Sequence, residues 1–297
     1  MKNMKIAVLY GGFSSEREVS LKTGRAVFDN LIKGGYKNVH LIDVDKNIVS
    51  NLLKIKPDVC FNALHGKFGE DGVIQGLLES MSIKYTGSNV SASAVAFDKA
   101  LSKMIFDAAK LPTANYFVWE KETLPEVYFD KFVVKPAREG STIGVSIVSD
   151  KAQLKNAISE ARKFDKKLVI EKFIEGKELT VGILGQTILP PIWIKPKKGF
   201  YDFESKYTKG MTEYIFETEL SGQQLERLRE VSLRAFNVLG CSGAARVDLI
   251  YDGSDFNILE VNTSPGMTET SLLPNAARKY GLDFLMLVEK MLEMAIA

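Results

Sequence analysis

The hydrophobic positions in the first third of the chain follow two alternating periodicities. Short apolar runs with the composition of buried strands are separated by segments in which apolar residues recur at helical spacing. The pattern predicts strands at residues 6–10, 39–44 and 59–64, with helices between them from about residue 16 and over residues 48–53. Strands and helices that alternate in this way form a parallel sheet covered by helices. We therefore expect a doubly wound α/β unit at the N-terminus.

The first helix is expected to begin just after Ser15 and to end near Gly34. Ser15 and Glu18 have the spacing of a capping box, and the pair of glycines from Gly34 favours helix termination. In a sheet of this class, ligands bind beyond the carboxyl ends of the strands. Two polar loops that contain glycine follow predicted strands there, at residues 11–16 and 65–72. Functional side chains are expected first in these loops.

Beyond residue 95 the pattern changes to short strands at hairpin-like spacing, which indicates a new domain. One helix is predicted over residues 91–109, and it is followed by strands at 131–135, 145–148 and 168–171 and by a helix over 152–164. A polar stretch at residues 195–214 has the length of a functional or disordered loop. The expected fold class is α/β at the N-terminus and α+β overall, with domains at residues 1–95, 96–178 and 179–297.

The overall composition excludes several classes of protein. The 297 residues include 39 Lys or Arg and 37 Asp or Glu, so the net charge of +2 gives no electrostatic reason to expect a nucleic-acid or membrane partner. No uncharged apolar stretch approaches the roughly 20 residues that span a bilayer, and no secretion signal is evident. Cys60 and Cys241 have apolar neighbours and are expected to be reduced core thiols. We expect a soluble cytoplasmic protein.

Two segments near the C-terminus predict a hairpin that carries candidate metal ligands. Residues 244–251 and 256–262 have strand character, and folding about their turn sets Asp248 near residue 259 or 260. Asp248, Glu260 and Asn262 then converge, and two carboxylates with an amide oxygen suit Mg²⁺. The alternative is a solvent-facing polar strand surface in which Arg246 simply pairs with Asp248. The apolar opposite face favours the metal site, because it marks the strands as buried on one side.

A second candidate is the glycine-bearing loop at residues 140–144, which follows Lys135 between two predicted strands. Backbone N–H groups of such a loop can approach phosphate oxygens, and Lys135 supplies a positive charge. An ordinary glycine hairpin is the alternative. The chain contains neither the P-loop motif nor the glycine fingerprint of dinucleotide-binding folds, so a nucleotide would be held in another way.

Glu16 and His65 are candidates because each follows a predicted strand of the N-terminal sheet. A favourable interaction with the helix N-terminus would by itself explain a glutamate at position 16, without a functional role. For His65, structural and functional roles are equally open from its position. His40 lies within a strand and is interpreted as structural.

Six blocks of the sequence are distinctive enough to indicate a protein family. They are Gly11-Gly-Phe-Ser-Ser-Glu16-Arg-Glu-Val-Ser-Leu21, Ala63-Leu-His65-Gly, Gly69-Glu-Asp-Gly72, Lys135-Pro-Ala-Arg-Glu-Gly-Ser141, Phe200-Tyr-Asp-Phe-Glu-Ser-Lys-Tyr207 and Leu259-Glu-Val-Asn-Thr-Ser-Pro-Gly-Met-Thr268. In order and spacing, over essentially the whole chain, they resemble the D-alanine–D-alanine ligases of the ATP-grasp superfamily.

The resemblance implies a three-domain ATP-grasp fold that grips ATP between its central and C-terminal domains. The implied reaction joins two D-alanines into D-alanyl-D-alanine, with ADP and phosphate as co-products, for peptidoglycan precursors. It also implies two Mg²⁺ or Mn²⁺ ions and a homodimer formed through the N-terminal domain. Two alternatives stay open: the same fold with a D-hydroxy acid as acceptor, and a nucleotide-binding regulatory protein without turnover.

The resemblance further implies a role for individual residues. The residues implied to bind ATP are Lys99, Lys135, Glu171, Lys172, Ile174, Glu178, Phe200, Lys206 and Leu259. The residues implied to hold the metal ions are Asp248, Glu260 and Asn262. The residues implied to bind the amino acids or to take part in catalysis are Glu16, His65, Ser141, Lys206, Tyr207, Arg246, Gly266 and Ser271.

Within the last set, Glu16 would hold the ammonium group of the first D-alanine, with His65 nearby. Ser271 and Lys206 would meet the carboxylate of the second D-alanine. Arg246 and the backbone N–H of Gly266 would stabilise the tetrahedral oxyanion.

Tyr207, in the polar loop, would join Ser141 and Glu16 in a hydrogen-bonded network that links the three domains. A tyrosine at this position of the loop resembles the branch of the family that forms dipeptides.

Overall fold

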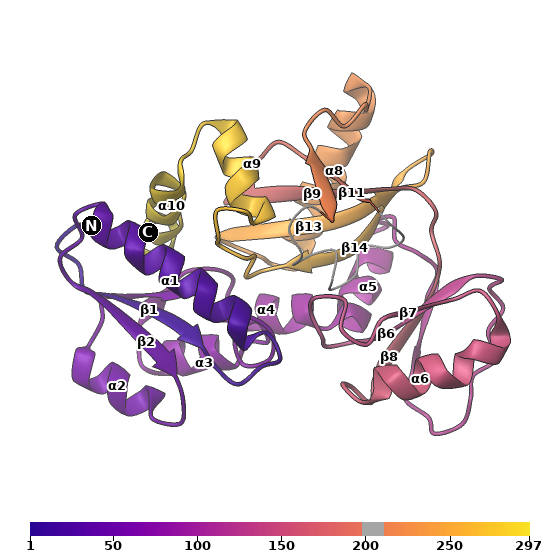
Figure 1. The fold of residues 1–297 in the computed structure, drawn as a ribbon, viewed down its shortest axis with the longest axis horizontal. Helices are drawn as coiled ribbons and strands as arrows, with labels where there is room; N and C mark the ends of the chain where they lie inside the picture. Colours follow the sequence, from indigo (N-terminus) through magenta and orange to yellow (C-terminus); the bar gives the residue numbers. More distant parts are fainter. Residues whose placement is uncertain (198–210) are drawn as a thin grey trace.

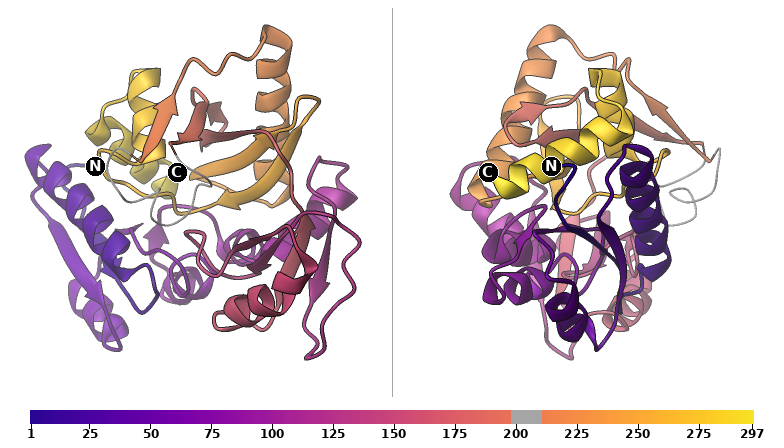
Figure 2. Two further views of the ribbon diagram at one scale, coloured as in Figure 1. Left: turned by 45° about the vertical axis from the view of Figure 1, so that its right-hand side comes forward. Right: turned by 90° about the vertical axis from the view of Figure 1, so that its left-hand side faces the viewer.

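The computed structural model describes residues 1–197 and 211–297, which form three β-sheets with helices packed against them (Figure 1). Both views of Figure 2 show the sheet of the C-terminal third above the other two. Phe200, Lys206 and Tyr207 lie outside the described residues. No helix in the described ranges combines the length and the apolar character needed to cross a bilayer.

The N-terminal sheet has four parallel strands in the order β2-β1-β3-β4. Its strands are β1 (Ile6–Gly11), β2 (Val39–Val44), β3 (Val59–Asn62) and β4 (Lys84–Tyr85). The three predicted strands are thus confirmed in a parallel arrangement. Their carboxyl ends share one edge of the sheet, so the loop after Gly11 and the loop that contains His65 meet there.

Helices cover both faces of this sheet, as the doubly wound prediction requires. On one face lie α1 (Arg17–Lys33) and α10 (Phe284–Ile296), and on the other lie α2 (Ile48–Ile55) and α3 (Val73–Ser80). The predicted end of the first helix is confirmed, because Gly34 is its C-cap. The predicted capping box is wrong: Glu16 is the N-cap residue, no side chain caps the helix, and the Ser15 hydroxyl reaches Glu139 instead.

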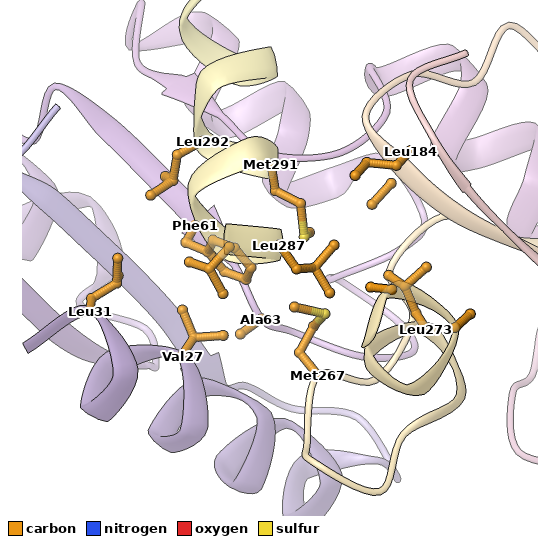
Figure 3. Packing of buried hydrophobic residues seen from close by; sticks show 14 of the residues in the cluster. Val27, Leu31, Phe61, Ala63, Leu184, Met267, Leu273, Leu287, Met291 and Leu292 are labelled. Carbon is orange, nitrogen blue, oxygen red and sulfur yellow. The ribbon is translucent and has the colours of Figure 1, made fainter. Parts of the chain in front are cut away.

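The C-terminal helix α10 packs back onto the N-terminal sheet (Figure 3). Leu287 and Met291 of α10 meet Phe61 of β3 and Val27 of α1, and Met267 lies beside them in the same buried cluster. Burying large apolar side chains in this way is the main source of stability between segments far apart in the sequence. It also fixes the chain around Met267 next to the carboxyl ends of the N-terminal strands.

The predicted single helix over residues 91–109 is wrong, because the structure has two helices there, α4 (Val90–Phe97) and α5 (Lys99–Ala108). Asp98 between them is extended, with φ −88° and ψ 99°, and its side chain accepts hydrogen bonds from the backbone N–H groups of Ala100 and Leu101. A side-chain oxygen at the N-cap satisfies donors that a helix N-terminus leaves free. The break therefore makes Lys99 the first residue of a new helix.

The central sheet is antiparallel, in the order β5-β8-β6-β7. Its strands are β5 (Tyr116–Trp119), β6 (Phe132–Pro136), β7 (Ser146–Val148) and β8 (Leu168–Lys172). The short 3-10 helix η1 (Lys151–Gln153) leads into α6 (Leu154–Arg162), which packs against the sheet. β6 and β7 pair as predicted, with the glycine loop between them.

The third sheet is antiparallel, in the order β12-β11-β9-β13-β14, and β10 also pairs with β9. Its strands are β9 (Lys177–Leu184), β10 (Thr187–Ile188), β11 (Ile192–Pro196), β12 (Thr212–Ile215), β13 (Ala244–Tyr251) and β14 (Phe256–Asn262). The helix α8 (Gly222–Val238) packs with α4 and α5 into one core on this sheet, and α9 (Leu272–Tyr280) contacts β9. The predicted hairpin is confirmed, with Asp248 opposite Glu260 and Arg246 opposite Asn262.

Candidate active site

Two adjoining cavities lie between the three sheets. The first, of about 280 Å³, is lined by residues from α1, from the loops after β3 and β6, and from the β13–β14 hairpin and the segment that follows it. The second, of about 110 Å³, lies between the central sheet and the same hairpin. Four residues, Lys99, Glu139, Gly140 and Glu260, line both cavities. Molecules bound in the two cavities would therefore lie next to each other and contact the same residues.

Glu16 reaches the first cavity from the turn between β1 and α1. Gly11 and Gly12 adopt positive φ angles of 76° and 79°, which lets the chain leave the strand and turn into the helix. The Glu16 side chain is buried and accepts a hydrogen bond from the hydroxyl of Ser141, in the loop of the central sheet. This contact joins two of the three sheets at the cavity.

His65 is held on both of its ring nitrogens. Nε2 lies 3.0 Å from the hydroxyl of Thr23 on α1, and Nδ1 lies 3.3 Å from a carboxylate oxygen of Glu70. His65, Glu70 and Glu16 all line the first cavity. The sequence left structural and functional roles of His65 equally open, and the structure places it inside the candidate site.

The electrostatics of this corner favour a positively charged occupant. Burial raises the pKa of Glu16, the charge of Glu70 raises it further, and the hydrogen bond from Ser141 opposes both effects. Two carboxyl groups held close together in a site of low polarity repel each other unless a cation lies between them. An ammonium group bound beside Glu16 would relieve that repulsion.

Another part of the lining of the first cavity lies at the N-terminus of a helix. Gly266 and Ser271 both line it, and Ser271 is the N-cap residue of α9. The Ser271 hydroxyl accepts a hydrogen bond from the backbone N–H of Thr268 at 3.0 Å. A helix N-terminus attracts anions, because its first N–H groups lack partners in the helix. This part of the cavity is therefore suited to a carboxylate.

The second cavity combines an apolar lining with lysines and carboxylates. Ala114, Val133, Ile143, Ile174, Ile250 and Leu259 supply the apolar part. The Lys135 ammonium donates a hydrogen bond of 2.6 Å to Glu171, and the Lys99 ammonium donates one of 2.6 Å to the carbonyl of Glu139. Burial opposes the charge of Lys99, but the carboxylate of Glu260, 3.0 Å away, raises the pKa of Lys99.

Asp248 and Glu260 face each other across the hairpin, and each has a cationic neighbour. Arg246 binds Asp248 through two hydrogen bonds of 2.9 Å, while Lys99 pairs with Glu260. The pairing that the sequence offered as the alternative to a metal site is therefore present. The donor set nevertheless fits Mg²⁺, since Asp248 and Glu260 both line the second cavity and could bind an ion together with phosphate oxygens. In the described ranges, no group of three or more His, Cys, Asp or Glu residues could hold a metal by itself.

Comparison with known proteins identifies the family. Residues 105–293 match the family profile described as D-ala D-ala ligase C-terminus, and residues 45–88 match the profile of its N-terminus. The D-alanine–D-alanine ligase of Syntrophotalea carbinolica is 47% identical over 297 residues, which cover 98% of this chain and 96% of that protein. The chain belongs to the D-alanine–D-alanine ligase family. The ligase of Carboxydothermus hydrogenoformans is 46% identical over 308 residues, which cover 99% and 98% of the two chains.

Structures of D-alanine–D-alanine ligases have the same fold. The crystal structure of the ligase from Bacillus anthracis complexed with ATP has a TM-score of 0.86 and 34% identity, covering 99% of this chain and 97% of that one. The predicted ATP-grasp fold is thus confirmed.

The structure brings together nearly all of the ligase residues that the sequence indicated. Lys99, Lys135, Glu171, Lys172, Ile174, Glu178, Asp248, Leu259 and Glu260 line the second cavity. Glu16, His65, Ser141, Arg246, Asn262, Gly266 and Ser271 line the first. These positions are observed; the roles assigned to the residues stay predictions.

Sequence reasoning missed three charged residues of the ligase site. Glu70 binds His65, and Glu139 lines both cavities, although both residues stand inside blocks that carried the resemblance. Lys103 pairs with Glu171 at 2.8 Å from behind the second cavity. Its signal in the sequence was its spacing from Ala100 and Phe106, which places a lysine on the apolar face of a helix.

Proposed function

We propose that this chain is an ATP-dependent ligase that joins two D-alanines into D-alanyl-D-alanine, with ADP and phosphate as co-products, for peptidoglycan precursors. Family membership over almost the whole chain supports this reaction. The observation that carries it in the structure is the pair of adjoining cavities, one lined by carboxylates and donors and the other by lysines and apolar side chains. No comparison favours a D-hydroxy acid as the acceptor.

The first cavity would hold the two amino acids. Glu16, buried beside Glu70, would bind the ammonium group of the first D-alanine, with His65 next to it. Ser271, at the N-terminus of α9, would bind the carboxylate of the second D-alanine together with Lys206. The Ser141 hydroxyl would hold Glu16 in place, and the resemblance adds Tyr207 to the same network.

The second cavity would hold ATP. Its apolar residues would enclose the base, with Ile174, Lys172 and Leu259 beside it, and Glu171 and Glu178 would hold adenine and ribose. Lys99 and Lys135 would contact the phosphates near Gly140, while Lys206 and Phe200 join them by resemblance. Asp248, Glu260 and Asn262 would hold two Mg²⁺ or Mn²⁺ ions, which when bound neutralise negative charge on the phosphate oxygens.

The reaction follows from the placement of the charges. A carboxylate is a poor electrophile, so the first D-alanine is phosphorylated by ATP, and the lysines that line the second cavity stabilise the transferred group. The amine of the second D-alanine, once deprotonated, attacks the acyl phosphate. Arg246 and the backbone N–H of Gly266 line the first cavity and would stabilise the tetrahedral oxyanion that forms. Collapse of that intermediate releases phosphate and leaves the peptide bond.

We also infer a homodimer that acts in the cytoplasm, on the basis of the family resemblance. Sedimentation of the purified protein measures its mass in solution, and a monomer at all concentrations would contradict the dimer.

The proposed reaction is tested by phosphate release from Mg-ATP with no amino acid, with L-alanine and with D-alanine, together with chromatography of the products. Release that requires D-alanine and is matched by the dipeptide is the expected result. Release of phosphate without any dipeptide would refute the ligation step. The variant Glu260→Ala, which removes a proposed metal ligand, is expected to abolish D-alanine-dependent release.

A further inference from the structure

One charged residue behind the nucleotide cavity has no part in the proposed reaction. Lys103 lies on α5, one helical turn after Lys99, and its side chain is 0% exposed. It is not among the residues that line either cavity. An ammonium group removed from water carries a large free-energy penalty, so a lysine retained there needs strong compensating contacts.

The contacts of Lys103 connect three parts of the nucleotide site. Its ammonium group lies 2.8 Å from Glu171 Oε2 on β8 and 5.2 Å from the centre of the Tyr116 ring on β5. It donates a hydrogen bond of 2.6 Å to the hydroxyl of Thr113, which in turn donates one of 2.9 Å to the carbonyl of Ile258 on β14. Lys103 thus ties α5 and the central sheet to the strand that carries Glu260.

The two carboxylate oxygens of Glu171 have different surroundings. Oε1 accepts a hydrogen bond of 2.6 Å from Lys135, a residue that lines the nucleotide cavity. Oε2 is fully buried, and within the described structure it accepts no aligned hydrogen bond, so the charge of Lys103 is what compensates its burial. Burial would raise the pKa of Glu171, but the charges of Lys135 and Lys103 lower it to about 2.

We propose that Lys103 is a positioning residue of the nucleotide site, which keeps Glu171 ionised and turned so that its Oε1 serves the nucleotide cavity. The inference rests on the proposed function, in which Glu171 holds the adenine base. A carboxylate can only accept hydrogen bonds, and the donor on adenine is its exocyclic amino group. Lys135 lines the cavity and would also contact the phosphates of ATP, whereas Lys103 lines neither cavity and pairs with Glu171 Oε2.

The preference for the amino group of adenine tests this role. Binding of ATP and of purine riboside 5′-triphosphate, which lacks that amino group, is measured by calorimetry on the full-length protein without amino acids. Wild-type protein is expected to prefer ATP by about 10- to 100-fold, the range for a hydrogen bond to a charged group. Lys103→Met is expected to lose most of this preference and to raise KM for ATP, with kcat at saturating ATP within about twofold of wild type.

Two further variants separate positioning from a general loss of stability. Phe106→Leu alters a fully buried residue on the same helix and is expected to lower the melting temperature while keeping the preference for ATP. If Lys103 acts through Glu171, the double variant Lys103→Met/Glu171→Gln will show the same preference as Glu171→Gln alone.

An unchanged preference in folded Lys103→Met would overturn the proposal, and so would an equal loss in Phe106→Leu. If Lys103→Met does not fold, the variant Thr113→Val tests the proposal in its place. It removes the hydrogen bond that anchors Lys103 but keeps the positive charge of Lys103. A reduced preference in Thr113→Val supports the proposal, and an unchanged one overturns it. Failure of the ligase function itself is distinguishable, since it would appear as wild-type protein that makes no dipeptide.

Discussion

Replacing Gly140 by alanine tests whether the position of Glu16 governs amino-acid binding. Gly140 lies in the loop between β6 and β7, against the Glu16 carboxylate. A Cβ at residue 140 would overlap that group, with its carboxyl carbon at 3.1 Å and Oε1 at 3.2 Å. Because the carboxylate ends a flexible side chain, we expect Glu16 to turn away and to lose the hydrogen bond from Ser141, while the fold is retained.

The size of the effect follows from the contact that is lost. A hydrogen bond to a charged group contributes about 1.5–3 kcal/mol, and about 1.4 kcal/mol corresponds to a tenfold change in an equilibrium constant. We therefore expect Gly140→Ala to raise KM for D-alanine by about 10- to 100-fold. Glu16 does not line the nucleotide cavity, so the affinity for ATP should change much less.

The assay is steady-state phosphate release at varied D-alanine, with calorimetric titration of ATP alongside it. Gly222→Ala is the matched control, because a Cβ at this exposed residue of α8 meets no atom within 4 Å. Unchanged KM for D-alanine in Gly140→Ala would refute the reasoning. A loss of ATP affinity as large as the loss for D-alanine would refute it as well.

Three further predictions concern the charges and thiols of the protein. Arg246→Ala is expected to keep ATP binding but to lower dipeptide synthesis by about 10²–10³, as measured by chromatography, and unchanged turnover would reject its role at the oxyanion. Burial and the charge of Glu70 raise the pKa of Glu16 above 4.5, so the folded state binds the proton of Glu16 more tightly than the unfolded state. The folded protein therefore becomes less stable as the pH rises and Glu16 ionises. Thermal denaturation should therefore find Glu16→Gln more stable than wild type at about pH 8, with the difference gone below about pH 4.5; equal melting temperatures at both would contradict the shift. Burial raises the pKa of Cys60 and of Cys241 to about 12, so iodoacetamide should label neither in the native protein and both after denaturation, as read by mass spectrometry.

The elements that the sequence predicted well are those with an uninterrupted periodic pattern. The strands β1 and β3 are short, buried and largely apolar runs, as buried parallel strands are, whereas the edge strand β2 also carries His40 and Asp43. The order of the three strands along the chain implied the parallel sheet. The hairpin register was predictable because the turn is short. The sequence left residues 259 and 260 both possible opposite Asp248, and a register shift explains the outcome. Asp248 pairs with Glu260 before the shift, and Leu249 pairs with Ile258 after it.

The break between α4 and α5 had only one local signal, the N-cap residue Asp98. Neither Gly nor Pro lies at residues 97–99, and the apolar spacing continues across them. The break depends on contacts with distant residues: Lys99 donates its backbone N–H to the carbonyl of Ala137, and Lys167 pairs with Asp98 at 2.9 Å. Such contacts override local helix preference.

The residues of the candidate site could be predicted where their type and spacing in the sequence indicated a chemical role. They were harder to predict where the role depends on burial in the folded structure. The metal-ligand set came from one hairpin, and Glu16, His65 and Lys135 came from their positions beside predicted strands. The remaining site residues came from the resemblance. Lys103 was missed because a lysine is normally exposed, and only the tertiary structure shows Glu171 and Thr113 around it.

The residues that line both cavities, Lys99, Glu139, Gly140 and Glu260, have a consequence for inhibitor design. An amino-acid mimic in one cavity and a nucleotide mimic in the other would therefore lie next to each other. A short covalent linker between two weak fragments would raise the effective concentration of the second fragment once the first is bound. Such a molecule would gain affinity from the linker alone, and a resistance substitution at Lys99 or Glu260 would also alter a side chain that lines the cavities of both natural substrates.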